Sequence, residues 1–255
     1  MKPAILPIRK DGEIRKPYLV HLLMLRTQFL NTLPETIILP LLKSISFYRN
    51  VLDVDQQQIK FILQYSKIFE LEPGETIIRK GEFDNWFYFI LKGQLLVYPE
   101  DENDSPIAYL PTGEMFGELA VVRDLMRMTT VMGDPNCKKI LLLGTDFSPF
   151  GDLNDSSNIT VDTKIAFYRS LIEVTKRRIE IIRSDFPKQT VERTSKEESV
   201  FSGKKGTMGE LNFLHKKAEG LIQELSQLNL YMGSKEKSRV YLIKETVDYI
   251  KEVMG

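Results

Sequence analysis

The sequence predicts an α+β protein built on a small antiparallel β-barrel or jelly roll with flanking helices. Three observations lead to this class: short β-rich runs separated by turns fill the middle of the chain, helical periodicity flanks them, and a leucine-type pattern fills the end. We expect an N-terminal arm and helices over 1–40, a central domain with its closing helix over 41–186, a linker over 187–206 and a C-terminal helical hairpin over 207–255.

The composition is that of an ordinary globular protein, with 42% hydrophobic and 27% charged residues among 255. Lysine and arginine balance aspartate and glutamate at 35 each, so no excess charge favours nonspecific binding to nucleic acid or an anionic membrane. The single cysteine, Cys137, cannot form an internal disulfide, which fits a reducing compartment. Met1–Lys16 lacks the apolar core of a signal peptide, and Leu19–Leu25 is too short to span a bilayer. We expect a cytoplasmic protein without a membrane span.

The N-terminal part is predicted to be a poorly ordered arm followed by helices. Two prolines and mixed charge characterise Met1–Lys16, whereas apolar residues at helical spacing predict a helix over Tyr18–Thr32. Pro34 and Pro40 should divide the region into two or three short helices. Asp55–Ser66 has one apolar and one polar face, as expected of a helix that lies on a core.

The central region has a strand-like pattern, with seven or so β-rich runs separated by glycine and proline turns. This number of short strands favours a barrel or sandwich over an open sheet. The predicted strands are Ile68–Leu71, Thr76–Arg79, Trp86–Leu91, Gln94–Tyr98, Ile107–Leu110, Met128–Met132 and Lys138–Leu143.

Two helical segments follow the strands. After a broken helix or loop over Asp146–Ile159, a helix capped by Asp162 should run to Pro187, with Lys176-Arg177-Arg178 on its polar side as a solvated face or an interaction patch. Thr207 and Glu210 form a capping-box pattern at the start of the hairpin. The hairpin should consist of two helices, over Leu211–Leu228 and Val240–Met254, in which apolar residues recur at steps of three and four. We expect a break between them at Gly233–Ser234.

The stretch FGELAVVRDLMRMTTV carries the candidate ligand site. Gly117 can adopt a positive φ, which would leave the amides of Glu118, Leu119 and Ala120 at a helix start, where an anion is favoured. Arg127 follows nine residues after Glu118 and could add its guanidinium to the same anion. This set suits a ligand with one phosphate and one sugar hydroxyl: Glu118 accepts from the hydroxyl, and the amides and Arg127 hold the phosphate.

This stretch resembles the phosphate-binding cassette of cyclic nucleotide-binding domains, and the resemblance extends from about Leu41 to about Phe186. It implies that Glu118 binds the ribose 2′-hydroxyl, that Arg127 binds the cyclic phosphate, and that the closing helices move on binding. Met126 in place of the usual proline, and Met128-Thr129 in place of Ala-Ala, depart from the family pattern. The residues that match it without a gap are Phe116, Gly117, Glu118, Leu119, Ala120, Arg127, Thr130 and Val131.

The resulting hypothesis is a cyclic nucleotide receptor that regulates a partner protein; a non-binding scaffold with the same fold is the alternative. Cyclic AMP is preferred, because Met128 stands where cyclic GMP-selective relatives often have threonine, although Thr129 keeps cyclic GMP open. Arg127→Ala is expected to abolish binding and leave the fold intact. The predicted ligand-binding residues are Gly117, Glu118, Leu119, Ala120, Arg127, Met128 and Thr129.

The sequence has no motif that indicates another function. We expect no catalytic residues, cofactor or metal, and no DNA binding, since the C-terminal segment has neither a recognition-helix pattern nor a basic excess. The C-terminal hairpin could pack on the rest of the chain or provide a homodimer or partner surface; the sequence leaves both open.

Overall fold

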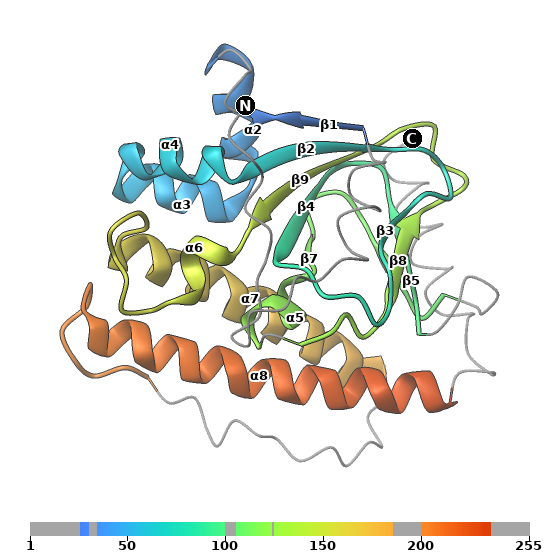
Figure 1. Cartoon of the computed structure of the whole chain (residues 1–255). Helices are drawn as coiled ribbons and strands as arrows, with labels where there is room; N and C mark the ends of the chain where they lie inside the picture. Colours follow the sequence, from blue (N-terminus) through green and yellow to red (C-terminus); the bar gives the residue numbers. More distant parts are fainter. Residues whose placement is uncertain (1–25, 31–34, 100–105, 124, 186–199, 236–255) are drawn as a thin grey trace.

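The computed structural model describes residues 26–30, 35–99, 106–123, 125–185 and 200–235 (Figure 1). Two antiparallel sheets face each other, and helices pack along one side of them (Figure 1). This arrangement confirms the predicted fold class. One sheet has the strand order β1 (Arg26–Phe29), β2 (Ser66–Leu71), β9 (Ile140–Asp146), β4 (Trp86–Lys92) and β7 (Met115–Phe116). The other has the order β3 (Thr76–Ile78), β8 (Thr130–Gly133), β5 (Leu95–Tyr98) and β6 (Ala108–Leu110).

Seven helices are described around these sheets. Three lie between β1 and β2, a short one lies between β7 and β8, and the rest follow β9 (Figure 1). They are α2 (Glu35–Ser44), α3 (Ser46–Val54), α4 (Gln56–Gln64), α5 (Glu118–Val122), α6 (Ser148–Gly151), α7 (Val161–Asp185) and α8 (Met208–Lys235).

Strand β4 separates two hydrophobic cores, because successive side chains of a strand point to opposite faces. Tyr88 and Ile90 pack in the cluster between the two sheets. Phe87 and Phe89 point the other way, into a larger cluster formed with the helices. Burial on both faces explains why this strand is a nearly continuous apolar run, WFYFIL, instead of an alternating one.

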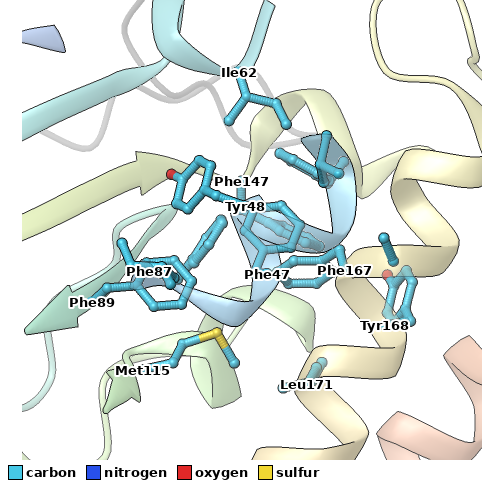
Figure 2. Close-up of a cluster of buried hydrophobic side chains, with 14 of the residues drawn as sticks. Phe47, Tyr48, Ile62, Phe87, Phe89, Met115, Phe147, Phe167, Tyr168 and Leu171 are labelled. Carbon is cyan, nitrogen blue, oxygen red and sulfur yellow. The ribbon is translucent and has the colours of Figure 1, made fainter. Parts of the chain in front are cut away.

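An aromatic cluster joins the helices to the barrel (Figure 2). The ring of Phe47 on α3 lies 4.9 Å from that of Tyr48, 6.2 Å from that of Phe87 on β4 and 5.8 Å from that of Phe167 on α7, in edge-on arrangements. Such pairs add about 0.5–1.5 kcal/mol each beyond their buried area. The cluster therefore fixes the first half of α7 against the outer face of β4.

The N-terminal end of α7 is also held by polar contacts. Lys164 is fully buried, and its ammonium donates to the backbone carbonyls of Asp152 and Asp155. Gln58 of α4 donates to the Asn158 carbonyl at 3.3 Å and accepts from the Thr160 amide at 2.9 Å. This end of the helix is thus tied both to the loop before it and to α4.

Helices α7 and α8 pack side by side and run in the same direction (Figure 1). Two ion pairs set their register: Arg169 with Glu210, and Arg183 with Glu224, the latter at 2.8 Å. Both pairs join residues 41 positions apart, so the contacts advance together along the two helices. The apolar face predicted for α8 packs within the chain, with its buried members at Leu211, Ala218, Leu221, Leu225 and Leu228.

Several element predictions were wrong in detail. The helix predicted for Tyr18–Thr32 is a strand at Arg26–Phe29, because this segment pairs antiparallel with β2 at the sheet edge. Helix α2 continues through Pro40 instead of breaking there. Strand β7 was not predicted, since two residues are too few to carry a periodic pattern.

The predicted helix ends also need correction. The hydroxyl of Thr160, one residue before α7, accepts from the Thr163 amide at 3.4 Å, so the cap precedes Asp162. Helix α8 continues through Gly233 and Ser234 to Lys235, so the predicted break is wrong. The capping box is confirmed in part: Thr207 Oγ1 accepts from the Glu210 amide at 3.3 Å, but the carboxylate of Glu210 accepts from Gly206. The N-terminal arm, most of the linker and the second hairpin helix lie outside the described residues.

Candidate functional site

The site is built on the turn between β7 and α5. Gly117 caps α5 with φ of 82°, as predicted, a conformation that costs a non-glycine residue free energy. A Cβ at this position would lie 3.1 Å from Arg127 Nη1 and 3.1 Å from the Trp86 carbonyl oxygen. Glycine is therefore required both by the backbone conformation and by the close approach of its neighbours.

Arg127 is buried, with 3% of its side chain exposed, and it points into this turn. Its Nε donates to Asp84 Oδ2 at 2.7 Å, and its Nη2 donates to Asp84 Oδ1 and to the Trp86 carbonyl. Its Nη1 donates to the Gly117 carbonyl. The fork is thus fixed by a bidentate carboxylate on one edge and by the cassette backbone on the other.

The buried tyrosine behind this ion pair lies in an apolar setting. Tyr88 stacks on Phe116 with ring centroids 5.1 Å apart, and its hydroxyl has no hydrogen-bond partner among the described residues. Burial raises the pKa of Tyr88 well above its ordinary value, and the nearby Asp84 raises it further. The phenol is therefore neutral at physiological pH and provides packing for the strand that carries the Trp86 carbonyl.

Glu118, the first residue of α5, has a fully buried side chain. Its Oε1 accepts from Nη1 of Arg178 at 2.6 Å, and Arg178 also donates to the Met115 carbonyl and lies 3.5 Å from Glu114 Oε2. The other oxygen, Oε2, has no hydrogen-bond partner among the described residues. A buried carboxylate oxygen without a donor is costly, so this atom would favour a hydroxyl brought by a ligand.

The structure places the seven predicted residues along one turn and its flanks. Gly117 and Arg127 are in direct contact, whereas the Glu118 carboxylate binds Arg178. Ala120 is buried and Leu119 half-buried in α5. Met128 and Thr129 are half-buried just before β8, which begins at Thr130 and not at Met128 as predicted.

Sequence reasoning missed two residues of the site. Asp84 lies 43 positions before its partner Arg127, in a loop whose sequence gives no sign of this pairing. Arg178 was assigned to a solvated or interacting basic face, yet its side chain is only 19% exposed and reaches Glu118. Its spacing held a signal, because Arg178 follows the buried Leu171 by seven residues and Thr175 by three, at the edge of the apolar face.

The flanking helices cover this turn. Arg178 belongs to α7, and α8 packs beside α5 (Figure 1). Within the described part of the chain, no cluster of three or more histidine, cysteine, aspartate or glutamate side chains could hold a metal ion. None of the helices in the described ranges has the length and apolar character needed to cross a membrane.

These features define a helix-flanked β-barrel domain whose cassette combines a glycine turn, a buried arginine and a buried glutamate. Residues 68–140 match the family model described as cyclic nucleotide-binding domain. The chain therefore contains a domain of the cyclic nucleotide-binding family, and this confirms the family resemblance.

Curated relatives match parts of the chain at about a third identity. A regulatory subunit of cAMP-dependent protein kinase from Yarrowia lipolytica is 36% identical over 76 residues, 30% of this chain and 20% of the relative. A putative potassium channel protein from Rhodopseudomonas palustris is 32% identical over 88 residues, 34% and 21% of the two chains. Human cGMP-dependent protein kinase 2 is 30% identical over 98 residues, which are 37% of this chain and 12% of the kinase. The matches thus span about a fifth or less of these relatives.

Solved structures match at lower identity. A cyclic nucleotide-binding domain from Methylobacillus flagellatus has a TM-score of 0.44 and 14% identity, covering 53% of this chain and 75% of its own. The regulatory subunit of a cAMP-independent protein kinase A from Trypanosoma brucei has a TM-score of 0.42 and 19% identity, and the match covers 59% of this chain and 49% of that subunit.

Proposed function

We propose that this chain is a cyclic nucleotide receptor whose ligand binds at the turn before α5. One observation carries the proposal: Glu118 is fully buried with one oxygen bonded to Arg178 and the other without a partner, directly after a turn whose backbone holds Arg127. A ribose hydroxyl would give the second oxygen its donor. The match of residues 68–140 to the family model supports the same assignment.

The phosphate would bind on the other side of the turn. Amides in the first turn of a helix lack intrahelical acceptors, so those of Leu119 and Ala120 suit an anion. Arg127 Nη1 now donates to the Gly117 carbonyl, and a phosphate oxygen would take over as its acceptor. Asp84 would keep the rest of the guanidinium in place during this exchange, because it binds the opposite edge.

Ligand entry requires movement of the helices. Glu118 and Arg127 are both buried, and α7 and α8 lie against this part of the domain. A ligand moves such an equilibrium only by its difference in affinity for the two arrangements. We propose that this difference is the signal, and that a non-catalytic output passes through a cytoplasmic partner protein or a second copy of the chain.

Cyclic AMP is the proposed ligand, with cyclic GMP as the second choice. Met128, half-buried after Arg127, supplies no hydroxyl for a guanine ring, whereas Thr129 supplies one a residue further on. Calorimetric titration with cyclic AMP, cyclic GMP and a cyclic dinucleotide tests this choice. Linear 5′-AMP is the matched control, because it carries the same base and sugar but a dianionic, open phosphate.

Two further readouts make the test sharp. Trp86 is the only tryptophan of the chain and its carbonyl accepts from Arg127, so its fluorescence should change on binding. Ligand at about 100 times its Kd should add about 2.7 kcal/mol to the free energy of unfolding. No heat, no fluorescence change and no rise in Tm at millimolar cyclic nucleotide would reject the receptor.

A non-binding scaffold is the second candidate, and one observation favours it. Nε, Nη1 and Nη2 of Arg127 all have acceptors within the chain, as they would in a domain whose cassette had become structural. The same titrations separate the two functions.

A further inference from the structure

We infer that a cavity separate from the cassette is a second binding site, which takes a zwitterionic ligand of the size of a tripeptide. The cavity has a volume of about 610 Å³ and is lined by residues of α3, of the first half of α7 and of the loop before α8. It lies at the end of the molecule where α8 begins (Figure 1). Cavities that bind small molecules typically have volumes of about 300–1,000 Å³. None of its lining residues belongs to the cassette, so this site is independent of the proposed function.

Helix α7 supplies one long wall of the cavity. Its lining residues stand at positions i, i+3, i+4 and i+7 and therefore form one stripe along the helix: Asp162, Ile165, Ala166 and Arg169. The stripe has an acid at one end, a base at the other and apolar side chains between them. At 1.5 Å per residue, the two charged residues are about 10.5 Å apart along the helix axis.

The other walls combine charge and apolar surface in the same way. Helix α3 contributes Asp53 and Val54, and Val54 is 59% exposed, so it leaves apolar surface that a ligand would cover. The loop before α8 contributes Lys205 and Gly206. A Cβ on Gly206 would lie 3.1 Å from Asp162 Oδ1, so this loop closely approaches the acidic end of the α7 stripe.

The charged groups of the cavity are available to a ligand. Among the residues that the structure describes, the side chains of Asp53, Asp162 and Lys205 make no hydrogen bond or ion pair. Arg169 donates to Glu210 through Nη2, and its side chain is 51% exposed, so the other donors of its guanidinium can bind a second anion. Charges of both signs thus line one cavity without neutralising each other.

This arrangement favours a ligand that carries a cation at one end and an anion at the other. A phosphate-bearing ligand would be repelled by the two carboxylates, and a purely cationic one by the two bases. A free amino acid has its two charges too close together to reach both ends of the α7 stripe. Three extended residues span at most about 10–11 Å, which matches the spacing of Asp162 and Arg169.

The same spacing gives the orientation of the ligand. The terminal ammonium of a tripeptide would bind Asp162, and its terminal carboxylate would bind Arg169 and Lys205. An apolar side chain in the middle of the peptide would cover Val54 and the apolar part of the α7 stripe.

Calorimetric titration of the full chain with the tripeptide Ala-Leu-Ala tests the site. N-acetyl-Ala-Leu-Ala and Ala-Leu-Ala-amide each lack one terminal charge, so the Kd of each should be about tenfold higher. Free leucine should bind at least about tenfold more weakly than the tripeptide, because it cannot reach both charged ends. Equal affinities for the free and the blocked peptides, or no heat at about 10 mM Ala-Leu-Ala, would overturn the inference.

Two variants with matched controls place the ligand in the cavity. Lys205→Gln should raise the Kd of Ala-Leu-Ala about fivefold but change that of Ala-Leu-Ala-amide less than about twofold, because the amide has no carboxylate to lose a contact. Lys204→Gln, one residue earlier and outside the cavity, should change neither.

Asp162→Asn makes the same test at the other end. It should raise the Kd of Ala-Leu-Ala about fivefold but change that of the N-acetyl peptide less than about twofold. Glu173→Gln, an exposed position of α7 outside the cavity, is its control. The four substituted side chains are exposed, so urea curves should show all four variants folded. Equal losses for free and blocked peptides in Lys205→Gln and Asp162→Asn, or equal losses in the controls, would overturn the inference.

Discussion

Arg127 and Glu118 stand on the same turn but have opposite environments. Arg127 is held by a carboxylate and two backbone carbonyls from its own domain core. Glu118 is held on one oxygen only, by an arginine from a helix outside the barrel. The phosphate side of the proposed site is therefore preassembled, whereas the sugar side depends on where α7 lies.

This difference also separates the two ion pairs energetically. The side chains of Arg127 and Asp84 are both 3% exposed, so neither can turn to water if its partner is lost. Arg178 keeps 19% of its side chain exposed and has Glu114 nearby. Breaking the first pair should damage the fold, and breaking the second should mainly loosen a helix.

Arg127→Ala tests the rigid side and should have the largest effect. The substitution leaves Asp84 buried without its cation, so we expect a loss of about 3–5 kcal/mol in the free energy of unfolding, together with loss of cyclic AMP binding. Urea denaturation and calorimetric titration measure the two effects. From the sequence alone we expected an intact fold for this variant, because the sequence did not reveal Asp84; the buried ion pair leads us to expect a loss of stability instead.

A double variant separates folding from binding. Arg127→Met with Asp84→Leu removes both charges and fills their volume with apolar groups, so it should regain most of the lost stability. It should still not bind cyclic AMP. A double variant that bound the nucleotide would show that Arg127 is not a ligand contact.

Glu118→Gln tests the helix-dependent side. Because Arg178 can turn toward Glu114 and solvent, we expect the free energy of unfolding to fall by about 1–2 kcal/mol, clearly less than for Arg127→Ala. Urea denaturation under the same conditions gives the comparison. A loss as large as that of Arg127→Ala would contradict the distinction between a rigid and a helix-dependent half.

The same contrast explains what the sequence could predict. Gly117, Glu118 and Arg127 lie in one short stretch, where the residue types and spacing already indicate a turn, a helix start and an anion contact. The strands of the barrel were predictable for a similar reason, since alternation and turn residues are local. Pro40 and β1 were predicted wrongly, because tertiary packing and pairing with β2 outweigh local preference there.

The contacts that distinguish the two halves are long-range and could not be read from local patterns. Asp84 meets Arg127 across 43 positions, and Arg178 meets Glu118 across 60. A charge in a loop or on a helix looks solvated until the fold shows what it faces. The residue types gave the chemistry of the cassette, but only the packing of α7 shows which half of it is shared with the helices.

Gly117→Ala perturbs the point where the two halves meet. A methyl group here would combine an unfavourable positive φ with crowding against Arg127 Nη1 and the Trp86 carbonyl, at a cost of about 2–3 kcal/mol. Gly113→Ala is the matched control, because Gly113 has a similar φ of 92° but nothing within 4 Å of the added atom. It should cost about 1 kcal/mol and leave cyclic AMP affinity unchanged. Equal losses of stability and affinity in both variants would argue against crowding at Arg127.

Glu210→Gln tests the helix pair through its pH dependence and should have the smallest effect. Burial raises the pKa of Glu210, but the Gly206 amide and Arg169 outweigh it, so the pKa lies below the ordinary 4.5. A carboxylate whose pKa is lowered in the folded state contributes its full stabilisation when the pH is above its pKa in the unfolded chain. It loses this contribution as the pH falls through its pKa in the folded state. The free energy of unfolding of the variant should be lower than that of the wild type by about 1 kcal/mol or less at pH 7, and the two values should converge toward pH 3.

The control for this measurement lies on the same helix. Glu219 is about half exposed and pairs with His215 at 3.6 Å on the surface of α8, so Glu219→Gln should change the stability profile by less than Glu210→Gln does. The quantity to compare is the free energy of unfolding from urea curves between pH 7 and pH 3. If Glu210→Gln and the wild type gave parallel profiles, Glu210 would not hold α8 to α7 as a carboxylate. The helix pair would then depend on its apolar face and on the Arg183–Glu224 pair.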